Sequence, residues 1–120
     1  MIRSHGARAL AFLLVALGAG GLAADEPKGD PVEFQWGIAI PMRDGVRLNA
    51  TLYKPRDQSA ALPCVFTLTP YISQGYHDRG MYFAANDYVF LTVDVRGRGN
   101  SEGRFTPLLQ EAKDGHDVVE

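Results

Sequence analysis

The residues able to do chemistry lie in two short segments that each follow a predicted strand. Residues 99–103 form a literal G-x-S-x-G pattern with Ser101 at its centre. In a nucleophile elbow the strand runs straight into the first glycine, and a helix begins immediately after the serine. Here residues 96–99 separate the strand from the rest of the pattern, and Gly103 and Pro107 oppose an immediate helix. Ser101 is therefore predicted to cap backbone groups in a glycine-rich turn rather than to act as a nucleophile.

Tyr71 is the better candidate for a catalytic group. It follows Thr69 and Pro70 at the carboxyl end of a predicted strand, and ligands of open α/β sheets bind in the crevice at that end. A phenolic hydroxyl placed there could donate a hydrogen bond to an oxyanion, and a preorganised donor of this kind stabilises it by roughly 3–4 kcal/mol. Considered as a single residue, Tyr71 has an alternative, because most tyrosines after a strand simply pack against their neighbours.

The pattern of histidine and cysteine predicts no metal site. His77 and His116 are too far apart in the chain to form a local pair, and no neighbouring carboxylate or cysteine completes a ligand spacing. Cys64 is the only cysteine, which excludes an internal disulfide and a multi-cysteine metal centre. His77 lies in a polar run and is expected to be a surface or substrate-loop residue rather than a base. No metal or organic cofactor is expected.

Charged residues indicate structural roles. The formal net charge of −2 gives no electrostatic reason to expect a nucleic-acid partner. Arg96 and Arg98 lie beside Asp94 and predict an ion-pair network that braces the turn, with an anion site as the alternative. Five charged residues near the end of the chain are predicted to form the solvated face of a helix. These residues are Glu111, Lys113, Asp114, Asp117 and Glu120.

The first folded element is predicted to be a β-hairpin. Apolar and polar residues partly alternate over residues 32–40 and again over residues 46–53, as they do in half-buried strands. Asp44 and Gly45 between them form a turn signal, because this dipeptide readily supplies the positive φ that tight hairpins require.

Two strands and two helices are predicted after the hairpin. Residues 64–69 form a continuous β-rich run that predicts a strand buried on both faces, and residues 88–95 predict a second buried strand. The spacing of apolar residues between them predicts a short helix bracketed by Gly80 and Asn86. A last helix is predicted over residues 108–120.

This order of elements indicates part of an α/β domain. A strand–helix–strand crossover implies a parallel sheet, which helices normally cover on both faces. Two parallel strands and two helices are too few to complete such a layered structure, and the last helix has no C-terminal stop signal. Residues 32–120 are therefore expected to be the N-terminal part of a larger α/β domain.

The N-terminal residues have the pattern of a secretory signal peptide. Arg3 and Arg8 form a basic region before the apolar run of residues 9–17, and small residues offer a cleavage site after Ala23 or Ala24. An uncleaved anchor or a buried helix are the alternatives, although a spanning helix needs about 20 apolar residues. We predict a signal peptide at residues 1–23, a linker at 24–31, and an exported protein, periplasmic or secreted, without membrane association after cleavage.

Several segments in a fixed order go beyond these local patterns. They are residues 40–48 (IPMRDGVRL), 69–71 (TPY), 93–103 (VDVRGRGNSEG) and 111–117 (EAKDGHD). Together they resemble the N-terminal part of the Xaa-Pro dipeptidyl-peptidase/cocaine esterase family of serine hydrolases. The resemblance covers essentially all of the chain after the linker.

The resemblance implies an α/β-hydrolase fold and cleavage of a small ester, amide or short peptide through an acyl-serine intermediate. By the same resemblance, Tyr71 is the tyrosine that lends its hydroxyl to the oxyanion hole, and the segment around Ser101 is a loop after a sheet strand. The catalytic serine, aspartate and histidine of the family correspond to positions beyond Glu120. The chain is therefore expected to stop before the nucleophile elbow and to be inactive alone.

One alternative from another functional class stays open. The chain could belong to a non-catalytic exported module that uses the same fold for binding or interaction. The sequence does not distinguish a peptidase from an esterase or an acylase, and it does not determine the oligomeric state.

Overall fold

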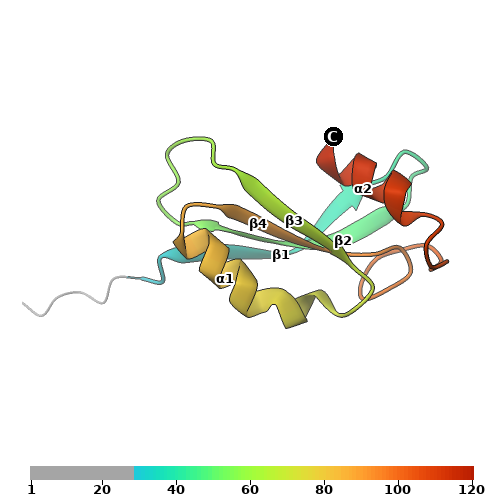
Figure 1. The fold of residues 1–120 in the computed structure, drawn as a ribbon, viewed down its shortest axis with the longest axis horizontal. Helices are drawn as coiled ribbons and strands as arrows, with labels where there is room; N and C mark the ends of the chain where they lie inside the picture. The colour runs from blue at the N-terminus through green and yellow to red at the C-terminus, as the bar shows by residue number, and fades with distance from the viewer. Residues whose placement is uncertain (1–28) are drawn as a thin grey trace, which may run out of the picture.

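The computed structural model describes residues 29–120 (Figure 1). The predicted signal peptide and residues 24–28 of the predicted linker lie outside this range. The described strands are β1 (Val32–Pro41), β2 (Arg47–Pro55), β3 (Cys64–Thr69) and β4 (Val89–Asp94). The helices are the 3₁₀ helix η1 (Ser73–Tyr76), α1 (His77–Ala85) and α2 (Glu111–Val119).

The strands form one mixed sheet in the order β1-β2-β4-β3. The strands β1 and β2 pair as the predicted antiparallel hairpin, and β4 runs antiparallel to β2 but parallel to β3. The parallel pair joined through α1 is the predicted crossover. The hairpin turn is also confirmed, because Gly45 has a φ of 85° and its N–H donates to the carbonyl of Met42 at 2.9 Å.

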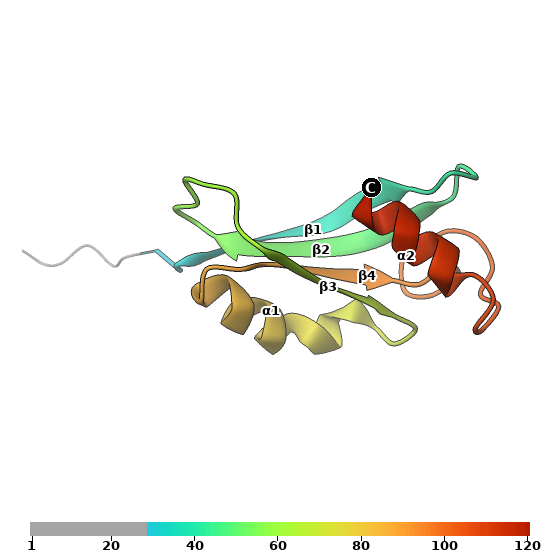
Figure 2. The same ribbon diagram turned by 45° about the horizontal axis from the view of Figure 1, so that its top comes forward.

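The two helices cover opposite faces of the sheet, and each face has its own apolar core (Figure 2). On the α1 face, Ala84 packs with Tyr53 and Phe90. On the other face, Val118 of α2 packs against a cluster that contains Leu48 and Val93. Successive side chains of a strand point to opposite faces, and so each strand contributes to both cores.

The strand β3 differs from its prediction, because within residues 29–120 it is not buried on both faces, and it also lies at the edge of the described sheet. It pairs only with β4 in this part of the chain, and Phe66 is 40% exposed. A continuous apolar run predicts that other elements cover both faces of the strand. It does not determine whether a second strand pairs with the other edge of that strand.

Both helices begin at residues other than those predicted. The helix α1 begins at His77, so Gly80 lies inside it rather than before it. Tyr53 lies against Gly80 and leaves no room there for a side chain, which explains a glycine within the helix. The helix α2 begins at Glu111 rather than at residue 108. Leu108 has a φ of 65°, outside the helical region, and its N–H donates to the Glu111 carboxylate at 3.0 Å.

No helix within residues 29–120 has the length and apolar character needed to cross a membrane.

Gly80→Ala should destabilise the intact protein, because an added Cβ would lie 2.5 Å from the Tyr53 ring. Overpacking of a well-filled core costs about 1–3 kcal/mol, which should appear as a lower free energy of unfolding in urea. The matched control is Gly115→Ala in α2, where an added Cβ meets nothing within 4 Å. That change should raise stability by up to about 1 kcal/mol through helix propensity. Equal effects of the two changes would contradict the close packing of α1 on β2.

Candidate functional site

The carboxyl ends of β3 and β4 lie side by side and place the candidate site residue Tyr71 at that end of the sheet. The N–H of Val95, just after β4, donates to the carbonyl of Thr69 at 2.9 Å. The N–H of Tyr71 donates to Oγ1 of Thr69 at 3.1 Å, while the tyrosine itself is 77% exposed. The phenol therefore does not pack into the core of the described residues, and its hydroxyl is accessible. The catalytic role of Tyr71 stays a prediction.

A buried carboxylate, Asp94, organises the backbone around these strand ends. Asp94 is the last residue of β4 and is 1% exposed. Its Oδ1 accepts a hydrogen bond from the N–H of Ser73 at 3.1 Å. Its Oδ2 accepts from Nδ2 of Asn49 at 3.1 Å and from the N–H of Asn100 at 3.3 Å. One side chain thus joins the segment after β3, the first residues of β2 and the glycine-rich loop.

This role of Asp94 was not predicted from the sequence, in which Arg96 and Arg98 are the expected partners. One signal was available, because an acidic residue at the end of a buried strand needs partners for its charge. Asn49, which lies between Leu48 and Ala50 in β2, supplies one of them.

The structure confirms that Ser101 caps backbone groups. Its Oγ accepts a hydrogen bond from the N–H of Asn49 at 2.8 Å and donates one to the carbonyl of Asp94 at 2.7 Å. Gly99 has a φ of 53°, and a Cβ there would lie 2.3 Å from Oδ2 of Asp94. The glycine-rich loop therefore closes over the Asp94 carboxylate, and neither feature resembles a nucleophile elbow.

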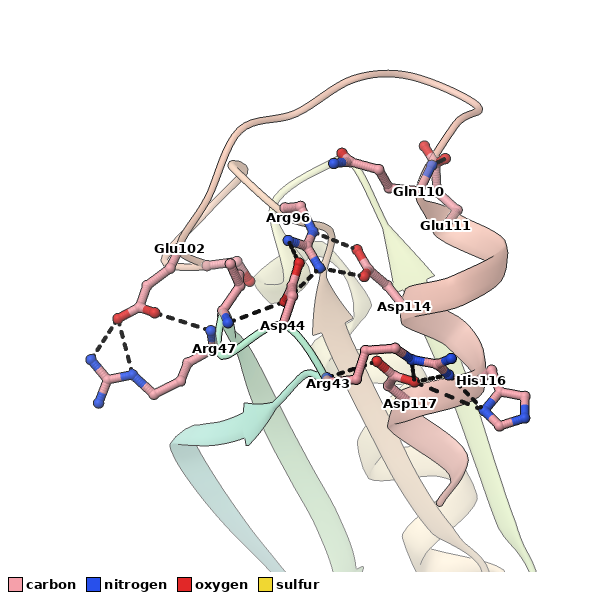
Figure 3. Close-up of polar contacts among 12 residues, drawn as sticks. Arg43, Asp44, Arg47, Arg96, Glu102, Gln110, Glu111, Asp114, His116 and Asp117 are labelled. Carbon is pink, nitrogen blue, oxygen red and sulfur yellow. Dashed lines mark hydrogen bonds and ion pairs between the residues drawn. The ribbon is translucent and has the colours of Figure 1, made fainter.

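The predicted ion-pair network exists, but with other partners (Figure 3). Arg96 is 8% exposed and forms two hydrogen bonds to Asp114 of α2, at 2.6 and 3.0 Å. It forms two more to Asp44 of the hairpin turn, at 2.6 and 3.3 Å. The bonds to Asp114 and then those to Asp44 raise the pKa of the Arg96 guanidinium above its ordinary value. Arg98 instead lies over the ring of Phe105, 4.4 Å from its centroid.

A second ion pair joins the hairpin turn to α2 (Figure 3). The backbone N–H of Arg43 donates to Oδ2 of Asp117 at 3.0 Å, and its Nε donates to Oδ1 at 2.7 Å. The side-chain hydrogen bond from Arg43, followed by the backbone one, lowers the pKa of Asp117 to about 2. Asp114 and Asp117 therefore do not belong to a solvated helix face, which corrects that prediction for two of its five residues.

The two candidate histidines lie on different helices, and each contacts neighbouring side chains. His77 begins α1 rather than lying in a polar loop, and its Nδ1 is 3.2 Å from the hydroxyl of Tyr53. The rings of Phe34 and Trp36 lie against His77, with Trp36 stacked at a centroid distance of 6.4 Å. His116 lies on α2 beside Arg43, 3.3 Å from its guanidinium. Within residues 29–120, no group of three or more His, Cys, Asp and Glu side chains is placed to hold a metal ion.

Comparison with solved structures identifies the class of fold. The structure superposes on an α-amino acid ester hydrolase with a TM-score of 0.64 and 23% identity, over 88% of this chain and 21% of the hydrolase. It also superposes on a CocE/NonD family hydrolase from Staphylococcus aureus, with a TM-score of 0.63 and 21% identity, over 72% of this chain and 19% of that one. The described residues thus have the fold of α/β hydrolases.

Sequence comparison identifies the family. The model of the X-Pro dipeptidyl-peptidase (S15) family matches residues 44–120. Cocaine esterase from Rhodococcus sp. (strain MB1 Bresler) is 31% identical over an alignment of 88 residues, and the match covers 68% of this chain and 15% of the esterase. The chain belongs to the X-Pro dipeptidyl-peptidase (S15) family, and it spans a small part of the length of these relatives.

The ion pair between Arg43 and Asp117 should make stability depend on pH in the acid range. The pKa of Asp117 is lowered from 3.8 to about 2 in the folded protein, so the pair contributes fully above the unfolded pKa. This contribution is lost as the pH falls through the folded value. Compared with Asp117→Asn, the intact protein should be more stable at pH 6, and the difference should shrink between pH 4 and 2. Urea denaturation across this range measures the difference, and a constant difference would contradict the pair.

Proposed function

We propose that this chain is part of a serine hydrolase that cleaves ester or amide acyl bonds through an acyl-serine intermediate. Its membership of the X-Pro dipeptidyl-peptidase (S15) family and its likeness to an enzyme named cocaine esterase support this proposal. The expected substrates are small esters, amides or short peptides. Within the described residues, the observation that carries the proposal is the exposed Tyr71 at the carboxyl end of β3.

The reaction would proceed in two acyl-transfer steps. A serine hydroxyl, deprotonated by a histidine, attacks the substrate carbonyl carbon, and the carbonyl oxygen becomes an oxyanion. Collapse of this tetrahedral intermediate expels the alcohol or amine, which takes a proton from the histidine, and leaves the acyl-serine ester. Water then attacks the ester by the same route and releases the acid. The serine, the histidine and their aspartate correspond, by the family resemblance, to positions beyond Glu120.

In this reaction Tyr71 would donate its phenolic hydrogen to the oxyanion, together with a backbone N–H. A donor fixed before the reaction stabilises the developing charge without the reorganisation that water would need. The location of Tyr71 supports this role, because Thr69 Oγ1 holds its backbone N–H while its side chain is free of the core. The hydroxyl would contact the negative charge only as the transition state forms, so removing the hydroxyl should lower kcat with little effect on KM.

Tyr71→Phe in the full-length enzyme should lower kcat by about 10²-fold or more with little change in KM, because only the oxyanion donor is removed. Steady-state kinetics on a chromogenic acyl ester measures this effect. The matched control is Tyr82→Phe, which changes an exposed tyrosine on α1, away from the strand ends. Turnover by Tyr71→Phe equal to that of the unaltered enzyme would refute the assignment.

Labelling with a fluorophosphonate distinguishes this proposal from a non-catalytic binding module. The reagent forms a covalent bond with an activated serine, and the full-length protein should therefore be labelled in a one-to-one ratio by intact mass. Labelling should persist in Ser101→Ala, since Ser101 Oγ is engaged with backbone groups. Absence of labelling in a correctly folded preparation, as judged by thermal unfolding, would favour the binding module.

We further propose that the protein is exported and that residues 1–23 are removed. The basic residues, the apolar run and the small residues before Asp25 support this proposal. Mass spectrometry of protein recovered from the cell envelope or medium should find an N-terminus at Ala24 or Asp25. Recovery of the protein with Met1 intact would contradict cleavage.

A further inference from the structure

We infer that Asp94 is a positioning residue that holds the segment carrying Tyr71 in place for oxyanion binding. This inference rests on the proposed function of Tyr71. Asp94 does not reach the reacting atoms, and it acts through the backbone of Ser73, whose N–H donates to its Oδ1 at 3.1 Å.

Among the described residues, hydrogen bonds fix the segment from Thr69 to Ser73 at both of its ends, and the middle of the segment does not pack. At one end, the carbonyl of Thr69 accepts from Val95, and Thr69 Oγ1 accepts from the N–H of Tyr71. At the other end, the buried Asp94 carboxylate holds Ser73. Between these points Tyr71 is 77% exposed and Ile72 is 68% exposed. Hydrogen bonds at the two ends therefore set where the phenol lies.

The Asp94 carboxylate is itself rigidly placed. The Nδ2 of Asn49 and the N–H of Asn100 bind Oδ2, which leaves Oδ1 oriented toward Ser73. Gly99 closes over the carboxylate so tightly that a Cβ would overlap it. The position of Tyr71 is thus connected, through one carboxylate, to the start of β2 and to the glycine-rich loop.

Both side-chain oxygens of Asp94 act as hydrogen-bond acceptors in this arrangement. A carboxylate accepts hydrogen bonds at both oxygens, and all three of its partners here are donors. An amide at this position would direct its NH₂ group at a donor, so that at least one of these bonds would be lost. If the bond to Ser73 loosens, the phenol moves relative to the oxyanion, and a misplacement of about 1 Å can cost 10²-fold in rate.

A double-mutant cycle in the full-length enzyme tests this inference. Asp94→Asn should lower kcat by about 10-fold or more with little change in KM, since it displaces a group that acts on the transition state. In the Tyr71→Phe background, Asp94→Asn should change kcat by less than about twofold, because the hydroxyl that Asp94 positions is already absent. Thr92→Val is the matched control, because Thr92 is buried on the same strand and its hydroxyl has no hydrogen-bond partner among the described residues.

Asn49→Ala provides a second cycle that also decides the question if Asp94→Asn does not fold. It removes one donor to Oδ2 of Asp94 and leaves the carboxylate in place. This milder change should lower kcat by about threefold, again only when Tyr71 is present. Thermal unfolding of each variant verifies that the folded enzyme is being assayed.

The outcomes separate the inference from the proposed function. If Tyr71→Phe alone has normal kcat, the proposed role of Tyr71 is wrong. If Tyr71→Phe is slow but the changes at Asp94 and Asn49 lower kcat equally in both backgrounds, Tyr71 is the oxyanion donor and the positioning role is overturned. Normal kcat in both Asp94→Asn and Asn49→Ala overturns it as well.

Discussion

Arg96 lies between two carboxylates, Asp44 in the hairpin turn and Asp114 on α2. Asp114 is buried, and removing a charge from water is costly unless a hydrogen-bonded partner of opposite charge compensates. The planar guanidinium can bind two carboxylates in a forked geometry, which an ammonium group cannot do. The position of α2 on the sheet therefore depends on Arg96 and is supported by the pair between Arg43 and Asp117. Val118 completes this attachment through apolar contacts.

The last residue of β4, Asp94, and Arg96 just after the strand hold two different groups of polar contacts. Asp94 and Arg96 are two residues apart, and both are buried, yet they have different partners. Asp94 accepts hydrogen bonds from donors around the strand ends, whereas Arg96 donates to acidic residues from the hairpin turn and α2. Hydrogen bonds therefore fix the backbone at the carboxyl ends of β3 and β4. Such preorganisation is what an oxyanion-binding site requires, because its donors must not rearrange during the reaction.

Much of the candidate site could be predicted from the sequence, since it depends on local patterns. Residues near one another in the chain determine the turn at Asp44 and Gly45, the helical crossover and the location of Tyr71 after β3. The capping role of Ser101 was also predictable, because its surroundings lack the strand and helix that a nucleophile elbow needs. The partners of Asp94 were not predictable, because Asn49 lies 45 residues away in the sequence.

The sequence by itself determined the order of the elements, the parallel crossover and the resemblance to S15 hydrolases, because periodicity and short motifs are properties of neighbouring residues. Only the tertiary structure decided which charges are buried. A helical pattern of acidic residues is typical of a solvated face, but Asp114 and Asp117 meet arginines from other segments. Likewise, an apolar run alone does not determine whether β3 lies inside a sheet or at its edge. Burial and pairing depend on contacts between distant segments, and the fold sets those contacts.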